Sequence, residues 1–277
     1  MNIRSKRKQL FVLTVSLLVL ASACTDDSGS AYTDFPVVEA YLLPGDSVAV
    51  KISRQLPFFS DAAYSADDIE NLSVSLSVKG SALMLTPGDS GWYYGYRQGL
   101  DEGDTLRLSF TFDERPVTAF TYIPSKPLNL TQTATKMYVP RMDSTSGPGG
   151  MGSMSDPVSI TWDNEDASYY MVVVENIEET LDPIRDFGDE EPPGNRFRKS
   201  PTTSATEMIR PFDFEYFGRH RVIVFHVLPD YATLYEQTTN SSLNLRNPST
   251  SITNGYGIFT GLNSDTLYIN VIESTSK

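Results

Sequence analysis

Residues 72–79 read Leu-Ser-Val-Ser-Leu-Ser-Val-Lys, an unbroken alternation of apolar and polar residues. Successive side chains of a β-strand point to opposite faces of a sheet, so a period of two predicts a strand with one buried and one solvated face. A helix would need apolar residues three and four positions apart. Strands buried on one face are typical of antiparallel sheets, so this stretch predicts antiparallel β-structure.

Similar alternation continues on both sides of this stretch, between short sequences that are typical of turns. Pro44-Gly45-Asp46, Pro87-Gly88-Asp89 and Glu102-Gly103-Asp104 are three such turns. The strands expected between them and before Pro124 are residues 48–52, 92–96, 106–112 and 117–123. Short strands at this spacing predict a β-sandwich over residues 35–125.

A second unit of the same kind is expected over residues 126–277. Its strands are expected at residues 128–139, 158–162, 169–174, 221–228 and 267–271. Tyr169 to Val174 is apolar at every position, which predicts a central strand covered on both faces. The sequence as a whole therefore predicts an all-β protein with two tandem β-sandwich domains.

The segments between these strands are less regular. Residues 143–157 are rich in Gly, Ser, Pro and Met and have no periodicity, which predicts a disordered insertion, with a domain linker as the alternative. Residues 178–201 are acidic, then Pro/Gly-rich, then basic, and are expected to form a long hairpin or surface loop. Short helices are expected only at residues 65–72 and 230–237.

The N-terminus has the three parts of a secretory signal. A basic region precedes a mostly apolar run at residues 10–20, and three small residues precede Cys24, the one cysteine in the chain. This arrangement resembles a bacterial lipoprotein signal, which predicts that residues 1–23 are removed and that Cys24 is acylated. The apolar run is about half the roughly 20 residues that a membrane-spanning helix needs, so anchoring by acyl chains in outer-membrane lipid is the expected attachment.

The residues after the cysteine predict where the chain is sent. Thr25, Asp26 and Asp27 resemble the short acidic tract that directs Bacteroidota lipoproteins to the outer face of the outer membrane. Residues 24–34 are small and polar and are expected to act as a flexible tether. A plain secretory signal followed by an unanchored protein is the alternative.

Composition limits the classes of partner. The chain has 22 basic and 35 acidic residues, and four of the basic residues lie in the predicted signal, so the mature charge is 18 − 35 = −17. This charge argues against binding to nucleic acid, because such binding needs Lys and Arg on phosphates. With its one cysteine assigned to acylation, the fold is expected to lack an intramolecular disulfide and a thiolate metal site.

Few residues carry the patterns of catalysis, and no catalytic residue, metal ligand or cofactor is predicted. His226 shares a strand face with apolar residues and is expected to be packed, whereas His220, beside two arginines, is expected to be exposed. No Gly-x-Ser-x-Gly motif or His-x-x-x-His pair occurs. The acidic loops at residues 163–166 and 182–191 are expected to be solvated; calcium binding or a hydrolase carboxylate pair are the alternatives.

Two local motifs remain as candidates for contact or for structure. Trp92, Tyr93, Tyr94 and Tyr96 fall on both faces of one expected strand, so some of them are candidate contacts for a glycan or protein partner, or else ordinary sheet surface. Gly255 and Gly257 flank Tyr256 and are expected to permit a bulge or tight bend. A glycine loop that grips a ligand is the alternative reading of the same pair.

Several sequence segments resemble one family. They are Val37 to Leu42, Gly91 to Tyr94, Phe225 to Tyr231, Asn247-Pro248 and Thr253 to Gly261. Their order is similar to that in domain-of-unknown-function family 4249, found among Bacteroidota lipoproteins, although the polar tip Asn263-Ser264-Asp265 departs from it. The resemblance implies an N-terminal immunoglobulin-like or transthyretin-like sandwich and a C-terminal fibronectin type III-like sandwich. It also implies a TonB-dependent receptor as a partner, because family members are often encoded beside such receptors.

The sequence therefore favours a non-enzymatic lipoprotein on the outside of the outer membrane. Its expected role is that of an accessory or binding module, with a TonB-dependent receptor, a glycan or a protein as partner. An extracellular hydrolase that uses loop carboxylates and a passive spacer in the envelope are the alternatives.

Overall fold

A computed structural model describes residues 34–55, 67–95, 99–142, 154–188, 190–239 and 250–274. The predicted signal peptide, Cys24, the Thr25–Asp27 tract, Tyr96 and residues 143–153 of the predicted insertion lie outside the described residues. Phe35–Gln55 and Ala63–Lys277 form one compact unit. The predicted all-β class is confirmed, because strands dominate the described part of the chain and assemble into several sheets.

The N-terminal strands form two facing sheets with one core between them. On one side, part of a ten-stranded sheet contains β1 (Pro36–Leu42), β2 (Val48–Arg54), β6 (Trp92–Gly95) and β5 (Thr86–Pro87). On the other side, a five-stranded sheet has the order β17 (Ile252–Thr253), β8 (Arg115–Tyr122), β7 (Thr105–Phe112), β3 (Ser75–Val78) and β4 (Ser81–Met84). The alternating Leu106, Leu108, Phe110 and Phe112 of β7 are all buried in this core, as their spacing predicts.

The C-terminal strands repeat this arrangement around a second core. The other part of the ten-stranded sheet contains β14 (Arg196–Arg198), β12 (Tyr169–Asn176), β16 (Tyr216–Val227), β18 (Tyr256–Glu273), β10 (Lys136–Val139) and β13 (Asp182–Pro183). A three-stranded sheet of β15 (Thr206–Ile209), β11 (Val158–Thr161) and β9 (Thr131–Gln132) packs opposite. Trp162 is buried in the core between them.

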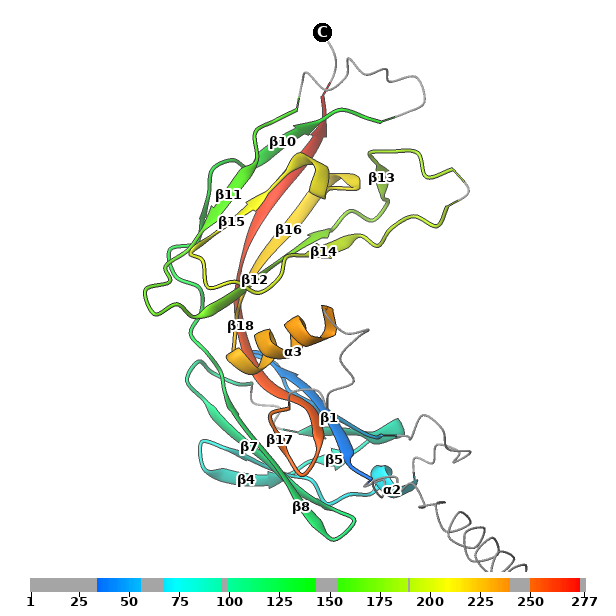
Figure 1. Ribbon diagram of the computed structural model, residues 1–277, viewed down its shortest axis with the longest axis vertical. Coiled ribbons are helices and arrows are strands. Elements are labelled where there is room, and N and C mark those ends of the chain that lie inside the picture. The colour runs from blue at the N-terminus through cyan, green and yellow to red at the C-terminus, as the bar shows by residue number, and fades with distance from the viewer. Residues whose placement is uncertain are drawn as a thin grey trace, which may run out of the picture. The chain divides into compact units, whose positions relative to one another are not determined.

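The long strand β18 belongs to both sandwiches (Figure 1). Its residues 256–261 pair in parallel with β1, and its residues 262–271 pair antiparallel with β16. Ile252 and Phe259 accordingly contribute to the same core as residues 38–123. The N-terminal sandwich is therefore completed by strands from the C-terminal end of the chain, in addition to the segment predicted from the sequence.

The polar residues of β18 lie where the strand changes partners. Asn263 is buried, and its side-chain amide donates a hydrogen bond to the carbonyl of Pro124 at 2.9 Å. Asp265 forms an ion pair with Lys126 at 3.1 Å. These side chains hold the segment that connects the two sandwiches. The polar stretch Asn263-Ser264-Asp265 therefore lies inside strand β18 and is not a tip.

The helices in the described part of the chain are short. α2 (Asp67–Glu70) buries Ile69, and two 3₁₀ turns, η1 (Asp89–Gly91) and η3 (Pro211–Asp213), precede strands. α3 (Pro229–Thr239) begins with proline, which lacks the N–H that the first helical turn leaves unpaired. Among the described residues, no helix combines the length and the apolar character needed to cross a bilayer.

Candidate functional site

One face of the C-terminal sheet carries a groove that we call the outer groove. Its volume is about 760 Å³, and its lining includes residues of β12, β14, β16 and β18 together with Tyr41 of β1 and Tyr231 of α3. Pockets that bind small molecules commonly have volumes of about 300–1,000 Å³. The groove therefore has the size of a ligand site.

The floor of the outer groove is apolar because β12 has apolar residues on both of its faces. Tyr170, Val172 and Val174 face the core, so the intervening Met171 and Val173 face the groove. Met171 lies opposite Phe225 of β16, and Val173 lies opposite Ile223. Met171 and Val173 are almost fully buried, within a separate apolar cluster that also contains Leu262. The strand predicted to be covered on both faces is thus apolar on both, and its second face forms the floor of a concave site.

Cross-strand register places charged residues beside this floor. Arg198 of β14 lies opposite Val173, and Arg196 lies opposite Glu175, which in turn lies opposite Arg221. Opposed residues of neighbouring strands share a sheet face, so all three arginines stand on the groove side. Arg221 forms an ion pair with Glu175, whereas Arg196 and Arg198 have no carboxylate partner among the described residues.

Two tyrosines close one side of the groove. The rings of Tyr41 and Tyr231 meet edge to face with their centroids 6.1 Å apart, and the Tyr231 hydroxyl donates to the sulfur of Met171 at 3.6 Å. Burial raises the pKa of both hydroxyls, so both phenols stay uncharged at neutral pH. The guanidinium of Arg198 in β14 lies 5.1 Å from the ring centroid of Tyr235, which is on α3 with Tyr231.

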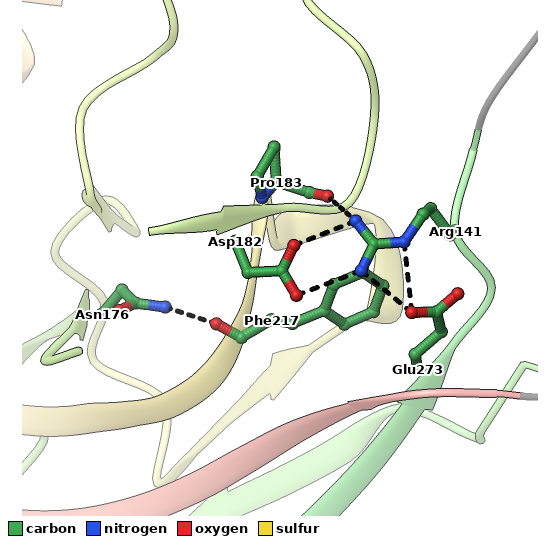
Figure 2. A network of polar contacts seen from close by, with 6 residues as sticks. All are labelled: Arg141, Asn176, Asp182, Pro183, Phe217 and Glu273. Atoms are coloured by element: carbon green, nitrogen blue, oxygen red, sulfur yellow. Dashed lines mark hydrogen bonds and ion pairs between the residues drawn. The ribbon is translucent and has the colours of Figure 1, made fainter. Parts of the chain in front are cut away.

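A second polar cluster, around Arg141, has a structural role (Figure 2). Its guanidinium donates to both oxygens of Asp182 at 3.0 Å, to Glu273 at 2.9 Å and to the carbonyl of Pro183 at 2.7 Å. The same group lies 4.7 Å from the ring centroid of Phe217. Hydrogen bonds to the two carboxylates raise the pKa of Arg141 above its usual range. These contacts join the chain after β10 to β13, β16 and the end of β18.

The acidic loops have separate partners. Asp182 is engaged by Arg141, and Asp163 accepts a hydrogen bond from Asn129 at 2.6 Å. Hydrogen bonds from Ser168 lower the pKa of Asp166. Within the ranges that the structure describes, no group of three or more His, Cys, Asp or Glu residues is placed to hold a metal ion.

A smaller pocket of about 160 Å³ lies beside the start of α3, and Asp230 lines it. Burial raises the pKa of Asp230, and the hydroxyl of Thr260 donates to its carboxylate at 3.0 Å. Among the described residues that line this pocket, Asp230 is the one carboxylate.

His220 corrects an expectation from the sequence, because it is buried and not exposed. Alternation along β16 places it on the core face with Val222, and its ring centroid lies 4.7 Å from that of Phe214. Its Nδ1 donates to the carbonyl of Gly218 at 3.1 Å, and its Nε2 accepts from Asn176 at 3.3 Å. Each ring nitrogen therefore has a partner that suits the neutral ring.

This environment predicts a pH-dependent stability. Burial lowers the pKa of His220 to about 4, below the value of about 6.5 in an unfolded chain. Between these two values the unfolded state binds a proton that the folded state does not, so stability falls as the pH falls. We expect the stability advantage of the wild type over His220→Gln to shrink by about 3 kcal/mol between pH 7 and pH 4. Urea unfolding of both proteins measures this difference, and parallel pH profiles would contradict it.

His226 is also buried, as its strand face predicts. Its Nδ1 donates to the carbonyl of Ser125 at 2.8 Å, and its ring stacks on Tyr170 with centroids 4.7 Å apart. This histidine therefore helps to hold the segment between the sandwiches.

The predicted aromatic contacts divide between the two faces of β6. Trp92 and Tyr94 are partly exposed and stack with their ring centroids 6.0 Å apart, and the Lys51 ammonium lies 5.5 Å from the Trp92 ring centroid. Tyr93 is fully buried, and its hydroxyl donates to the carbonyl of Ile69. Tyr93 thus has no ring surface for a partner, and Trp92 and Tyr94 are not part of the lining of the outer groove.

The glycine motif lies at the start of β18. Gly257 has φ of +97°, and a Cβ atom there would lie 2.0 Å from the carbonyl oxygen of Val38. A Cβ atom at Gly255 would lie 3.0 Å from the carbonyl oxygen of Pro36. Gly257 therefore allows β18 to approach β1 closely, and Gly255 allows the chain just before β18 to pass close to Ile252 and Pro36.

The outer groove is not predicted by the sequence. Two signals were present: the second apolar face of Tyr169 to Val174, and the basic end of residues 178–201, which supplies Arg196 and Arg198. Each signal has an ordinary explanation alone. Only the pairing of β14 with β12 brings them together.

The chain matches the model of a protein family. A family model with the description "Domain of unknown function (DUF4249)" matches residues 25–267, which include nearly all of both sandwiches. No curated protein matches the chain.

Proposed function

The chain belongs to the family described as Domain of unknown function (DUF4249), and we propose that it is a non-enzymatic, surface-anchored binding lipoprotein of the outer membrane. The observation that carries the binding role is the outer groove, a concave site with an apolar floor and a few charged side chains at its rim. Such a combination is typical of sites that bind small molecules.

The anchoring part of this proposal is supported by the N-terminal sequence. Cys24 follows a basic region, an apolar run and three small residues, and Thr25 to Asp27 provide the acidic tract for surface export. Each CH₂ group of an acyl chain on Cys24 that is buried in lipid would contribute about 0.8 kcal/mol to membrane binding. Two or more acyl chains are enough for stable attachment. Mass spectrometry of the N-terminal peptide tests it: an acylated Cys24 is expected, and an unmodified N-terminus would contradict it.

We also propose the finer fold assignment that the family resemblance implied. In this view, the N-terminal sandwich is immunoglobulin-like or transthyretin-like, and the C-terminal sandwich is fibronectin type III-like. The buried Trp162 in the C-terminal core supports this, since such sandwiches often bury a tryptophan between their sheets.

A TonB-dependent receptor is the proposed protein partner, and the family resemblance supports it. A receptor-associated lipoprotein that binds a small molecule would hold that molecule close to the receptor. The stacked Trp92 and Tyr94 offer an exposed aromatic surface for a receptor or glycan contact, separate from the groove.

The binding role is tested by asking what co-purifies with the protein. Ile223 is half-buried in the groove floor, so Ile223→Trp is expected to place a bulky ring over the floor and obstruct it. Met84→Trp adds the same ring at an exposed position outside it and is the matched control. Native mass spectrometry of protein from its own envelope should show a small molecule bound to the wild type and to Met84→Trp and lost from Ile223→Trp. Equal ligand content in all three proteins would contradict the role.

A further inference from the structure

We propose that the outer groove binds a small anionic amphiphile, a molecule with one acidic group and an apolar body. This inference rests on the proposed binding function and adds the chemical class of the ligand. It follows from three features of the groove: the apolar floor, the arginines beside it and the neutral tyrosine hydroxyls.

The floor of the groove favours a ligand with an apolar body. Val173 pairs with Ile223 and Met171 pairs with Phe225, so four apolar side chains form a continuous two-strand surface. Ile223 and Phe225 remain half-buried although they lie in the middle of a sheet, so apolar area stays open to the groove. Covering that area with an apolar ligand removes it from water, which is favourable.

The arginines at the rim of the groove favour a ligand with an anionic group. Arg196 and Arg198 are exposed, have no carboxylate partner in the described part of the chain, and stand two residues apart on the same face of β14. The predicted mature chain has a net charge of −17, so two arginines without a carboxylate partner on one concave face are a local exception to its acidity. A guanidinium presents paired N–H donors that match the oxygens of a carboxylate, sulfonate or phosphate.

The remaining polar groups do not oppose an anion. Glu175 is the one carboxylate that lines the groove among the described residues, and its charge is balanced by Arg221. The hydroxyls of Tyr41 and Tyr231 stay uncharged at neutral pH, because burial raises the pKa of both, so they do not repel an anion. A cationic ligand would instead face two unbalanced arginines, so the groove disfavours it.

The register also orients the ligand. Arg198 shares a cross-strand row with Val173 and Ile223, at the β14 edge of the sheet. Leu262 and Tyr41 line the opposite side. The acidic group is therefore placed at the β14 edge, and the apolar body lies across β12 and β16 toward β18.

Binding of naphthalene-2-sulfonate tests the ligand class, because this probe joins a permanent negative charge to an apolar ring system. Phe35–Gln55 and Ala63–Lys277 form one compact unit without residues 1–34, so the chain from Thr25, which lacks the acylation site, is suitable for titration calorimetry. We expect the sulfonate to bind, neutral 2-naphthol to bind at least about tenfold more weakly, and raised salt to weaken only the sulfonate.

The arginines are tested with a matched pair of double variants. Arg196→Gln with Arg198→Gln should weaken sulfonate binding by about tenfold or more and leave naphthol binding unchanged. Arg107→Gln with Arg219→Gln removes the same charge from exposed arginines that lie over Phe120 and Tyr268, and it should have no effect. Thermal unfolding of each variant confirms that it is folded.

Three results would overturn the proposal. Equal binding of naphthol and sulfonate, unaffected by the Arg196/Arg198 change, would refute the anionic class while leaving a binding groove in place. Tighter binding of a poly-glutamate peptide than of the sulfonate would point instead to an acidic protein partner. Failure of every probe to bind, together with no co-purified molecule, would refute both this inference and the proposed function.

Discussion

Replacing Gly257 with alanine is expected to lower the free energy of unfolding by about 4 kcal/mol. Gly257 has φ of +97°, a conformation that costs an L-residue free energy. In addition, the new Cβ would lie 2.0 Å from the carbonyl oxygen of Val38. Because this oxygen belongs to the backbone, a change of side-chain rotamer cannot relieve the clash. The pairing of β18 with β1 would have to open.

A matched glycine separates the two causes of this loss. Gly103 has φ of +82°, and a Cβ atom there would meet no other atom within 4 Å. Gly103→Ala therefore carries the backbone cost alone, about 1 kcal/mol. Urea unfolding of both variants measures the difference, and equal losses would show that the close approach of β18 to β1 contributes nothing.

Replacing Phe259 with alanine is expected to lower the free energy of unfolding by about 3–5 kcal/mol. Phe259 is fully buried in the N-terminal core, although it lies more than 130 residues beyond the end of that sandwich as predicted from sequence. Removal of its ring would leave a cavity between two closely packed sheets, which can relax only in part to fill it. Phe120→Ala, the same change at a side chain that is 51% exposed, should cost less than about 1 kcal/mol.

The two tryptophans allow this effect to be located. Trp92 lies in the N-terminal sandwich and Trp162 is buried in the C-terminal core, and they are the two tryptophans of the chain. In Trp162→Phe background, fluorescence reports on Trp92, and the Phe259→Ala change should shift that unfolding transition to lower urea. An unshifted Trp92 transition would contradict a role for β18 in the N-terminal core.

Local alternation predicted much of the fold because burial on one face leaves a direct trace in the sequence. The alternation at 106–112 and the continuous apolar run at 169–174 correspond to β7 and β12. The turn residues between strands were also informative, since glycine and proline favour specific backbone angles. These features depend on neighbours in sequence, which is why they were readable.

The parallel pairing of β1 with β18 could not be predicted in the same way. Val37 pairs with Tyr256 across more than 200 residues, and no local pattern records such a partner. Asn263, Ser264 and Asp265 resemble a turn because they are polar, yet they lie in β18 and fasten the segment around Pro124. Tertiary hydrogen bonds here override the local preference.

The same reason explains why the sequence does not predict the outer groove. Its floor and its arginines come from segments that are separate in sequence and meet only through the β12–β14 and β12–β16 registers. The prediction that His220 is exposed is wrong because it rests on the charged neighbours Arg219 and Arg221, whereas strand alternation turns the His220 side chain inward. A charged neighbour says little about the opposite face of a strand.

Amide hydrogen exchange with and without saturating naphthalene-2-sulfonate tests the outer groove most directly. We expect slower exchange in peptides from β12, β14, β16 and α3, and no change in β2 and β6 around Trp92. Protection that is absent from the groove strands, or that is confined to β2 and β6, would contradict the claim that this groove is the binding site.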